Sequence, residues 1–201
     1  TEIEVISLNN VCKLGNDYLE IKNFIQNFNF KNLHVKFENV LSLEKKTEDQ
    51  ISEYKLYTNN VVLSILQVLQ MYLDKYLHLI EQEEQMFLNG NVFKLIEIEV
   101  RFREFIDLFP EMKLIIVSVQ NLKEISGSFL DTLYNSKFNG NNFIEGFYNS
   151  LLKEVFESYK KILSNWIFKS KIQSGNSIFF ISKISSNPKE NTQKELDWEN
   201  D

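Results

Sequence analysis

The sequence predicts an all-α protein, an elongated antiparallel helical bundle with short loops and a polar C-terminal tail. Glycine and proline are scarce, at 6 and 2 in 201 residues, so little interrupts long helices. Hydrophobic residues make up 43% of the chain, which is enough to fill a core. Over most of the chain these residues recur three or four positions apart, which is the spacing of one helix face.

The first helix is expected over residues 3–28. Its predicted apolar face consists of Leu8, Cys12, Gly15, Leu19, Ile21, Ile25 and Phe28. Cys12, the only cysteine, is expected to be a buried thiol on this face. A glycine inside a helix costs about 1 kcal/mol relative to alanine. A close helix crossing would explain Gly15, and a local kink is the alternative. Residues 29–46 are expected to be a loop with one extended stretch over 33–37.

A second, long helix is expected over residues 47–87. Thr47 and the acidic residues after it resemble an N-cap with a capping box, and Gly90 is a stop signal. The apolar positions are Val61, Val62, Ile65, Leu66, Val68, Leu69, Tyr72, Leu73, Tyr76, Leu77, Ile80 and Phe87. So wide a stripe, interrupted at Glu83, favours a helix surrounded by several neighbours over a two-stranded coiled coil.

Four further helices are expected. The first covers residues 92–109 and uses Phe93, Ile96, Val100, Phe102, Ile106 and Phe109. Pro110 is interpreted as a boundary in the first turn of the next helix, which continues to about residue 122. The others cover residues 128–137 and 143–170, separated by a turn over 139–142. Antiparallel packing follows from the short connections.

The chain is predicted to form one helical domain over residues 1–184, with two sub-bundles divided between about 90 and 140 as an alternative. Phe179, Phe180 and Ile181 form a short apolar run that is interpreted as a strand or an anchored coil. Residues 185–201 are polar and are interpreted as a mobile tail or linker. Because the chain begins with Thr1, a longer parent protein is expected.

Charge and composition argue against several function classes. The formal net charge is −6, which disfavours binding to nucleic acid and to anionic membranes. No run of 18 uncharged apolar residues predicts a membrane span. One cysteine cannot form an internal disulfide, and a reducing cytoplasmic compartment is the simplest interpretation.

The sequence shows no catalytic or metal-binding pattern. His34 and His78 lack a neighbouring nucleophile, and the acidic run over residues 81–84 points to different sides of a helix and is interpreted as a solvated face. No cofactor, metal site or enzymatic activity is therefore expected. The aromatic residues, including 17 Phe and 8 Tyr, are interpreted mainly as core, with some available for a partner.

Four segments, in order along the chain, resemble the N-terminal region of the gamma-tubulin complex component family, in the form it takes in component 4. The first is NNVCKLGNDYLEIKNFIQNF at 9–28, which contains Cys12, Gly15, Asp17 and Tyr18. Residues 72–88 resemble a long helix of the family, and residues 108–136 resemble its Leu-Phe-Pro helix, here with Phe109 and Pro110. Residues 163–181 resemble the first grip motif, with Trp166, Phe179, Phe180 and Ile181 in matching positions. The family usually has glycine where this chain has Ser170.

This resemblance implies a stiff helical scaffold of the gamma-tubulin ring, which makes lateral contacts to related components and supports microtubule nucleation. It also implies a location in the cytoplasm at the microtubule organising centre or spindle pole. Gamma-tubulin itself would be bound by the C-terminal half of such proteins. Two alternatives stay open from the residues alone: a helical adaptor that receives an amphipathic partner helix in a groove, and an enzyme with a site in the bundle core.

Overall fold

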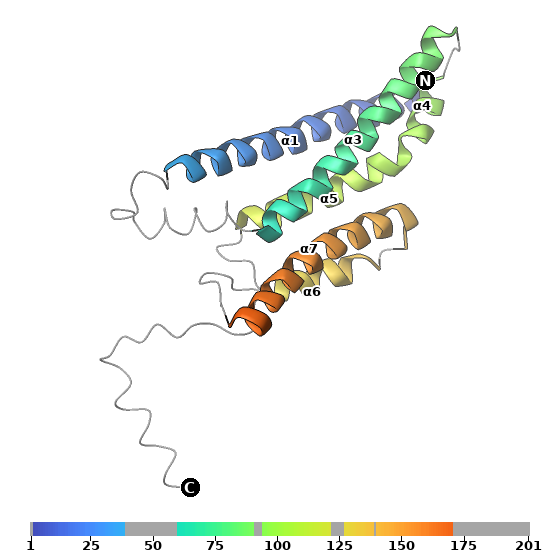
Figure 1. Ribbon diagram of the computed structural model, residues 1–201. Coiled ribbons are helices and arrows are strands. Elements are labelled where there is room, and N and C mark those ends of the chain that lie inside the picture. Colours follow the sequence, from blue (N-terminus) through green and yellow to red (C-terminus); the bar gives the residue numbers. More distant parts are fainter. Residues whose placement is uncertain (1, 39–59, 91–93, 122–126, 139, 171–201) are drawn as a thin grey trace, which may run out of the picture.

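The computed structural model describes residues 2–38, 60–90, 94–121, 127–138 and 140–170, and in these ranges the regular structure is entirely helical (Figure 1). The helices are α1 (Glu2–Glu38), α3 (Asn60–Leu88), α4 (Leu95–Arg101), α5 (Arg103–Asn121), α6 (Gly127–Ser136) and α7 (Asn142–Lys169). The predicted all-α class is confirmed. The predicted cap at Thr47, the apolar run Phe179, Phe180 and Ile181, and the tail 185–201 lie outside the described residues.

The helices form three layers, with α1 at one edge, α3 and α5 in the middle, and α7 with α6 at the other edge (Figure 1). Helix α3 runs antiparallel to α1, α5 and α7, as expected for neighbours in the bundle. Helices α5 and α7 instead run in the same direction, because Phe105 pairs with Phe143 and Glu111 with Tyr148. The α1–α3 pair matches Tyr18 with Tyr76, and the α3–α7 pair matches Ser64 with Ser158. Consequently α1 and α5 run in the same direction, because each is antiparallel to α3.

The broad apolar stripe of α3 is the centre of the core. Its residues from Val61 to Tyr76 contact α1, α5 and α7, and Ile65 and Leu69 are almost completely buried. Tyr72 packs edge-on against Phe147 of α7, with ring centroids 5.0 Å apart. Burying each such side chain stabilises the fold by about 1.5–3 kcal/mol. The prediction of several neighbours is confirmed, but the stripe ends early, because Phe87 is 64% exposed.

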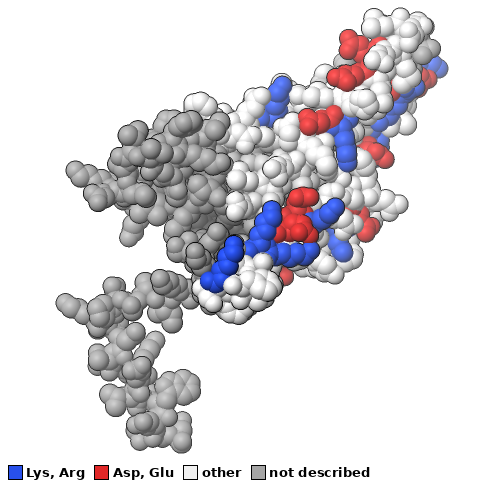
Figure 2. Space-filling model, viewed as in Figure 1, with Lys and Arg blue, Asp and Glu red and all other residues white. Residues whose placement is uncertain are grey.

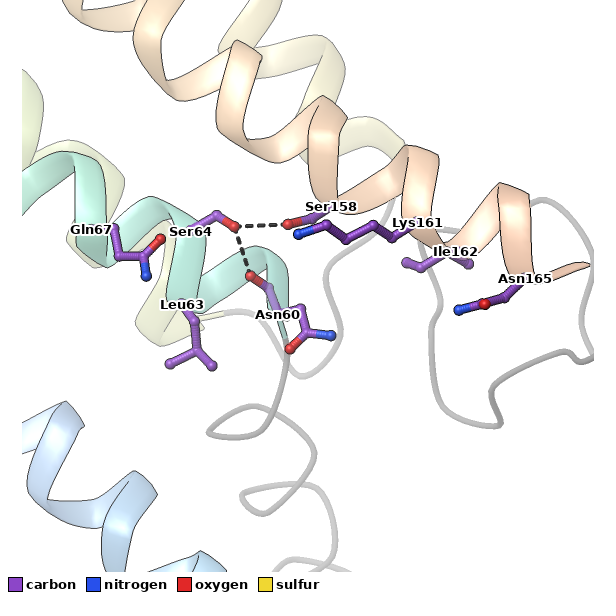
Figure 3. Close-up of a pocket in the computed structure, with 8 residues that line it drawn as sticks. All are labelled: Asn60, Leu63, Ser64, Gln67, Ser158, Lys161, Ile162 and Asn165. Atoms are coloured by element: carbon purple, nitrogen blue, oxygen red, sulfur yellow. Dashed lines mark hydrogen bonds between the residues drawn. The ribbon is translucent and has the colours of Figure 1, made fainter.

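Two serines bring α3 and α7 together at one end of their contact (Figure 3). Ser64 Oγ donates to the carbonyl oxygen of Asn60 at 2.9 Å, so Ser158 must donate to Ser64 Oγ, at 2.8 Å. Both hydroxyls are buried. Short side chains allow the helix backbones to approach closely, and the mutual hydrogen bond satisfies polar groups that burial would otherwise penalise.

Helix α1 corrects two expectations. It continues to Glu38, so residues 29–38 are helical rather than a loop, and the extended stretch over 33–37 does not exist. Its buried face is formed by Ser7, Leu14, Asp17, Ile21, Ile25 and Phe28. Leu8 and Leu19, which were expected on that face, are about half exposed, at 50% and 51%. In the first half of α1, the buried positions are therefore shifted by about one residue from those predicted.

The interpretation of Pro110 as a helix boundary is also wrong, because Pro110 lies inside α5. The break occurs earlier, at Phe102 between α4 and α5. A proline inside a helix costs about 3 kcal/mol. Here Leu108, Phe109 and Met112 are fully buried on the same helix, so continuing α5 buries more apolar surface than a break would. In α4, by contrast, Ile96 and Val100 are exposed rather than buried as expected.

The ends of α7 agree with the predicted turn and helix. Asn141 caps its start, with Oδ1 accepting from the backbone N–H of Phe143 at 2.9 Å. Ser170 caps its end in the left-handed conformation, with φ of 50°, and its N–H bonds to the carbonyl of Trp166. This conformation favours glycine over serine.

We therefore expect Ser170→Gly to stabilise the fold by about 0.5–1 kcal/mol, because it removes the steric cost of a left-handed serine. The free energy of unfolding, measured by urea denaturation, checks this. The matched control is Ser164→Gly, an exposed position inside the same helix, which should destabilise by about 0.5 kcal/mol. If both variants changed the free energy of unfolding in the same direction, the assignment of Ser170 as a left-handed cap would be contradicted.

Candidate assembly surface

The four family-like residues in α1 differ in burial and do not share one face of the helix. Asp17 is buried and Tyr18 is half-buried, and both face the other helices. Cys12 is exposed, which corrects the expected buried thiol. Gly15 would meet nothing within 4 Å if it carried a Cβ, so the expected close crossing is absent among the described residues, and α1 continues through it.

The inward face of α1 is tied to α5 by a charged cluster. Lys113 Nζ donates to Asp17 Oδ1 at 2.8 Å and to Glu20 Oε2 at 2.7 Å. The Asp17 side chain is only 9% exposed, whereas Glu20 is 62% exposed. The hydrogen bond to Asp17, and then that to Glu20, raise the pKa of Lys113 above its usual value. Lys113 therefore satisfies a carboxylate that would be costly to bury alone.

Tyr76 of α3 joins the aromatic residues of α1 and α5. Its ring lies 5.5 Å from that of Tyr18 and 5.1 Å from that of Phe109, between ring centroids. Phe102 and Phe105 pack against the same ring. Burial, and then the neighbouring Tyr18, raise the pKa of Tyr76. Residues that the sequence placed in two separate family-like segments, Tyr18 and Phe109, thus meet through a third helix.

Helix α5 is tied on its other side to α7. The Tyr148 hydroxyl donates to Glu111 Oε2 at 2.7 Å. Burial, and then this hydrogen bond, raise the pKa of Tyr148 well above its ordinary value. Because Glu111 and Lys113 lie on the same helix, α5 is connected by polar contacts to both edges of the bundle.

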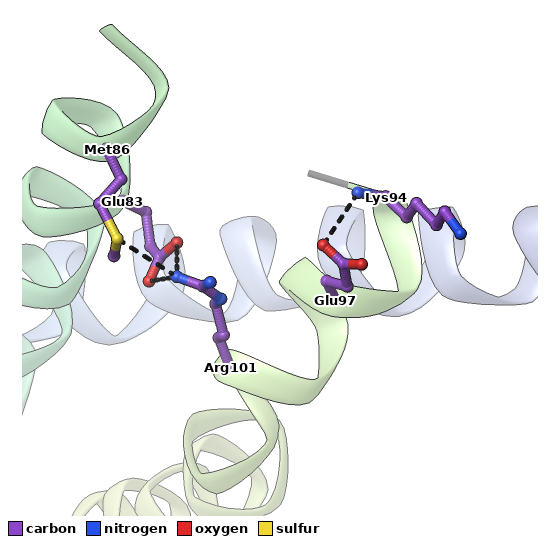
Figure 4. Close-up of polar contacts among 5 residues, drawn as sticks. All are labelled: Glu83, Met86, Lys94, Glu97 and Arg101. Atoms are coloured by element: carbon purple, nitrogen blue, oxygen red, sulfur yellow. Dashed lines mark hydrogen bonds and ion pairs between the residues drawn. The ribbon is translucent and has the colours of Figure 1, made fainter. Parts of the chain in front are cut away.

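The far end of α3 is connected to α4 by a salt bridge (Figure 4). Arg101 reaches both carboxylate oxygens of Glu83, at 2.7 and 2.6 Å. The Glu83 side chain is only 14% exposed, so this residue departs from the solvated face expected for residues 81–84. In α4 the backbone N–H of Lys94 donates to Glu97 at 3.3 Å, which satisfies a group at the helix start.

The first turns of α1 are tied to α4. Asn10 Nδ2 donates to Glu99 Oε1 at 2.7 Å. A hydrogen bond from Ser7, and then that from Asn10, hold the pKa of Glu99 below its ordinary value of 4.5. These contacts fix where the α1 end of the bundle meets α4.

The remaining family-like residues do not converge on one site. Phe109 is fully buried, whereas Pro110 beside it is exposed. Trp166 is partly buried near the end of α7. Sequence reasoning missed Lys113 and Glu99, because their partners come from distant parts of the chain. It placed Tyr76 on the apolar stripe of the long helix but had no signal for its ring contacts with α1 and α5.

Several outer helix faces expose aliphatic side chains. On α1 these are Val5, Leu8 and Leu19, and on α4 and α5 they are Ile96, Val100, Leu114 and Val117. On the face shown in Figure 2, acidic and basic side chains interleave over α7 and do not gather into a patch of one sign. Exposed apolar side chains with mixed surrounding charge are compatible with protein–protein contact sites.

The described residues offer little for chemistry. The pocket in Figure 3 has a volume of about 280 Å³ and is lined by Asn60, Leu63, Ser64, Gln67, Ser158, Lys161, Ile162 and Asn165. This lining contains neither a carboxylate nor a histidine that could serve as a base for Ser158. His78 is exposed and bonds to Gln82 within its own helix.

In the described ranges, no three His, Cys, Asp or Glu side chains group as a metal site requires. None of the helices described there combines the length and hydropathy of a membrane span.

We expect Lys113→Met to destabilise the fold by about 2 kcal/mol, because Asp17 would stay buried without its cation. Thermal and urea unfolding measure the change. The control is Glu20→Gln, which removes the exposed partner of the same lysine and should cost less than about 0.5 kcal/mol. Equal losses in the two variants would show that burial of Asp17 does not govern this cluster.

A second expectation concerns pH. Because the folded-state pKa of Glu99 is lowered, its contribution is present above about 4.5 and is lost as pH falls through the folded-state pKa. Glu99→Gln should therefore lower the melting temperature at pH 7, and the difference from the unmodified protein should disappear once the pH falls below the folded-state pKa of Glu99. Glu104→Gln, at an exposed position of α5, is the control and should leave the pH profile unchanged. A difference in melting temperature that persists at low pH would contradict the role of the Glu99 charge.

Comparison with known proteins agrees with the family-like segments. The model of the gamma-tubulin complex component N-terminal family matches residues 4–201. No curated protein and no solved structure gives a significant match. The family match covers almost the whole chain, including both the charged cluster at Asp17 and the aromatic contacts of Tyr76. The chain therefore belongs to the gamma-tubulin complex component family, as an N-terminal region of that family.

Proposed function

We propose that this chain is a non-catalytic scaffold that packs side by side with related gamma-tubulin complex components and so supports microtubule nucleation. In this role it acts in the cytoplasm, at the microtubule organising centre or spindle pole. The collinear segments described above favour the component 4 branch of the family. Gamma-tubulin binding belongs, in this proposal, to a C-terminal half and not to the helices described here.

The observation that carries the proposal is the exposed aliphatic surface on α4 and α5. Val100 is 69% exposed and Leu114 is 61% exposed, and Ile96 and Val117 lie on the same two helices. Helix α5 is nevertheless well anchored, because its residues Leu108, Phe109 and Met112 fill the core. Exposed apolar residues on a firmly held helix suit a protein partner, because little side-chain or backbone order is lost on binding.

Stiffness supports the same role. The layers are cross-connected by Lys113 to α1, by Glu111 to α7 and by Arg101 to the end of α3. A cross-connected bundle holds its outer faces at fixed separations, which a template for a regular array needs. No such rigidity would be required of a simple flexible tether.

A groove between α1 and α3 supports a second candidate, an adaptor that binds an amphipathic helix. It has a volume of about 620 Å³, and its lining includes Ile25, Leu63, Leu66 and Met71. Met71 is 40% exposed and can adapt its shape to a partner. A helix of partner origin would lay its apolar side in this groove.

The experiment is reconstitution with the other gamma-tubulin complex components, followed by size-exclusion chromatography. We expect the chain to co-elute with at least one of them at micromolar concentration. The double variant Val100→Lys/Leu114→Lys should weaken this association at least tenfold, because two charges would have to be desolvated at the contact. Both positions are exposed, so folding should be unaffected.

Asn149→Lys, an exposed position on α7, is the matched control and should leave co-elution unchanged. Failure of the unmodified chain to bind any component would contradict the scaffold role. Loss of binding on Met71→Lys, with Val100→Lys/Leu114→Lys unaffected, would instead favour the adaptor that uses the α1–α3 groove.

A further inference from the structure

Two hollows adjoin each other on the surface of α3. The first is the pocket between α3 and α7, with a volume of about 280 Å³ (Figure 3), and the second is the groove between α1 and α3, with a volume of about 620 Å³. Leu63 and Gln67 line both hollows, so the two meet on α3. Asn165, in the last two turns of α7, lines the pocket. Together the hollows lead from the end of α7 across α3 to α1.

The pocket carries polar groups that are free to bind a ligand. In the described part of the chain, the side-chain amides of Asn60, Gln67 and Asn165 make no hydrogen bond, although all three border the pocket (Figure 3). An amide side chain can both donate and accept, as a peptide group does. Three such amides around one hollow can therefore bond to the backbone of a segment that crosses it.

The groove is more apolar than the pocket. Ile25 and Leu66 are buried along it, and Met71 is 40% exposed. Its volume falls within the roughly 300–1,000 Å³ of clefts that bury small organic molecules. The groove can therefore hold aromatic side chains.

One carboxylate of the groove is available to a cation. Asp74 is exposed and accepts a hydrogen bond from Gln70 Nε2 at 2.8 Å, and no cation among the described residues pairs with it. The adjacent Lys75 lies instead over the ring of Tyr72, with Nζ 4.0 Å from the ring centroid. The groove therefore favours an apolar segment that is followed by a positive charge.

The residues that follow α7 have these properties in the same order. Residues 171–177 read KIQSGNS and are mostly polar. Residues 178–181 read IFFI and are the only run of consecutive apolar residues between 171 and 201. Lys183 comes two positions later. Starting from the end of α7, polar, apolar and positive residues thus match the pocket, the groove and Asp74.

We propose that residues 178–181 of this chain bind in its own α1–α3 groove, with residues 172–177 crossing the pocket. Phe179 and Phe180 then cover Leu66 and Met71, and the backbone before them meets the free amides of the pocket. Lys183 reaches Asp74, because three extended residues after Phe180 cover about 10 Å and Asp74 lies about 12 Å beyond Leu66 along α3.

The connection is long enough for this arrangement. Ser158 pairs with Ser64, so Ser170 lies twelve residues, or about 18 Å along the helix axis, beyond the level of Ser64. The groove lies about 15 Å to the side of α7, which is one and a half helix spacings. The straight distance is then about 23 Å, whereas the nine residues from 170 to 179 extend to about 30 Å.

The short connection also explains why this segment, and not a separate molecule, is the occupant. A binding segment on a short linker has an effective concentration of about 1 mM at its own site. A second copy or a partner helix would have to exceed that concentration, or bind more tightly, to displace it.

The first test uses the methionines of the full chain as reporters. The chain has three, Met71, Met86 and Met112, so carbon-13 labelling of their methyl groups gives three assignable NMR signals. Phe179→Leu/Phe180→Leu keeps the run apolar but removes both rings. The Met71 signal should then move by more than its linewidth, because it loses a ring-current shift, and the other two should not move.

The matched control is Trp198→Leu, which removes an aromatic ring from the same polar segment but outside the apolar run. It should leave the Met71 signal in place. A Met71 signal that does not respond to Phe179→Leu/Phe180→Leu, or that responds equally to Trp198→Leu, would overturn the proposal.

The second test measures proximity. In a Cys12→Ser background, a nitroxide label attached at Ser185→Cys should weaken the Met71 signal severalfold. The Met86 signal should weaken less, because Met86 lies about 22 Å farther along α3. Equal weakening of both signals would contradict docking in this groove.

A mixed sample separates the occupants. Spin-labelled chains without carbon-13 are added to isotope-labelled chains without the nitroxide, and the Met71 signal should keep its intensity. Its loss would show that a second copy fills the groove and would overturn binding within one chain. A Met71 signal that moves only when another gamma-tubulin complex component is added would assign the groove to a partner and would also overturn the proposal.

This docking goes beyond the scaffold role and does not depend on it. Binding to other components is tested through Val100 and Leu114, which lie on α4 and α5. Failure of the tail to dock would leave that binding intact, and failure of that binding would leave the Met71 signal unchanged.

Discussion

The burial of α3 is the constraint on which the rest of this structure depends. Its apolar stripe from Val61 to Tyr76 is too wide for one neighbour, so α1, α5 and α7 must all pack around it. All three of these helices run antiparallel to α3 and therefore parallel to one another. Tyr76 is an example, because its buried ring contacts both Tyr18 of α1 and Phe109 of α5.

Polar contacts then fix the register in which these apolar faces meet. The contact between Lys113 and Asp17 fixes the position of α5 along α1. The contact between Glu111 and Tyr148 fixes its position along α7. Ser64 and Ser158 do the same between α3 and α7. Each contact satisfies a buried or half-buried group that a shifted register would leave without its partner, and such a shift costs about 1–3 kcal/mol per group. Apolar burial supplies most of the stability, and these pairs supply specificity.

The outer faces connect the fold to the assembly role proposed for this member of the gamma-tubulin complex component family. A bundle held together in this way can expose Val100 and Leu114 on one pair of helices and Leu8 and Leu19 on another without losing its shape. The two surfaces differ in character, because the residues between Leu8 and Leu19 on the same side of α1 are uncharged while α5 carries Arg103 and Asp107 beside its aliphatic residues. Surfaces that differ in this way suit contacts with different partners.

The sequence by itself determined the helical class, the wide stripe of α3, and helices α6 and α7 to within a residue or two, because periodicity, caps and turn residues are local properties. It could not choose between the two apolar rows of α1, since Leu8 and Leu19 repeat as regularly as Leu14 and Ile21. Nor could it continue α5 through Pro110, whose local cost is offset only by burial of Phe109 and Met112. Tertiary structure alone decided these points and the pairing of Asp17 with Lys113, 96 positions away, because each depends on which helices come to lie side by side.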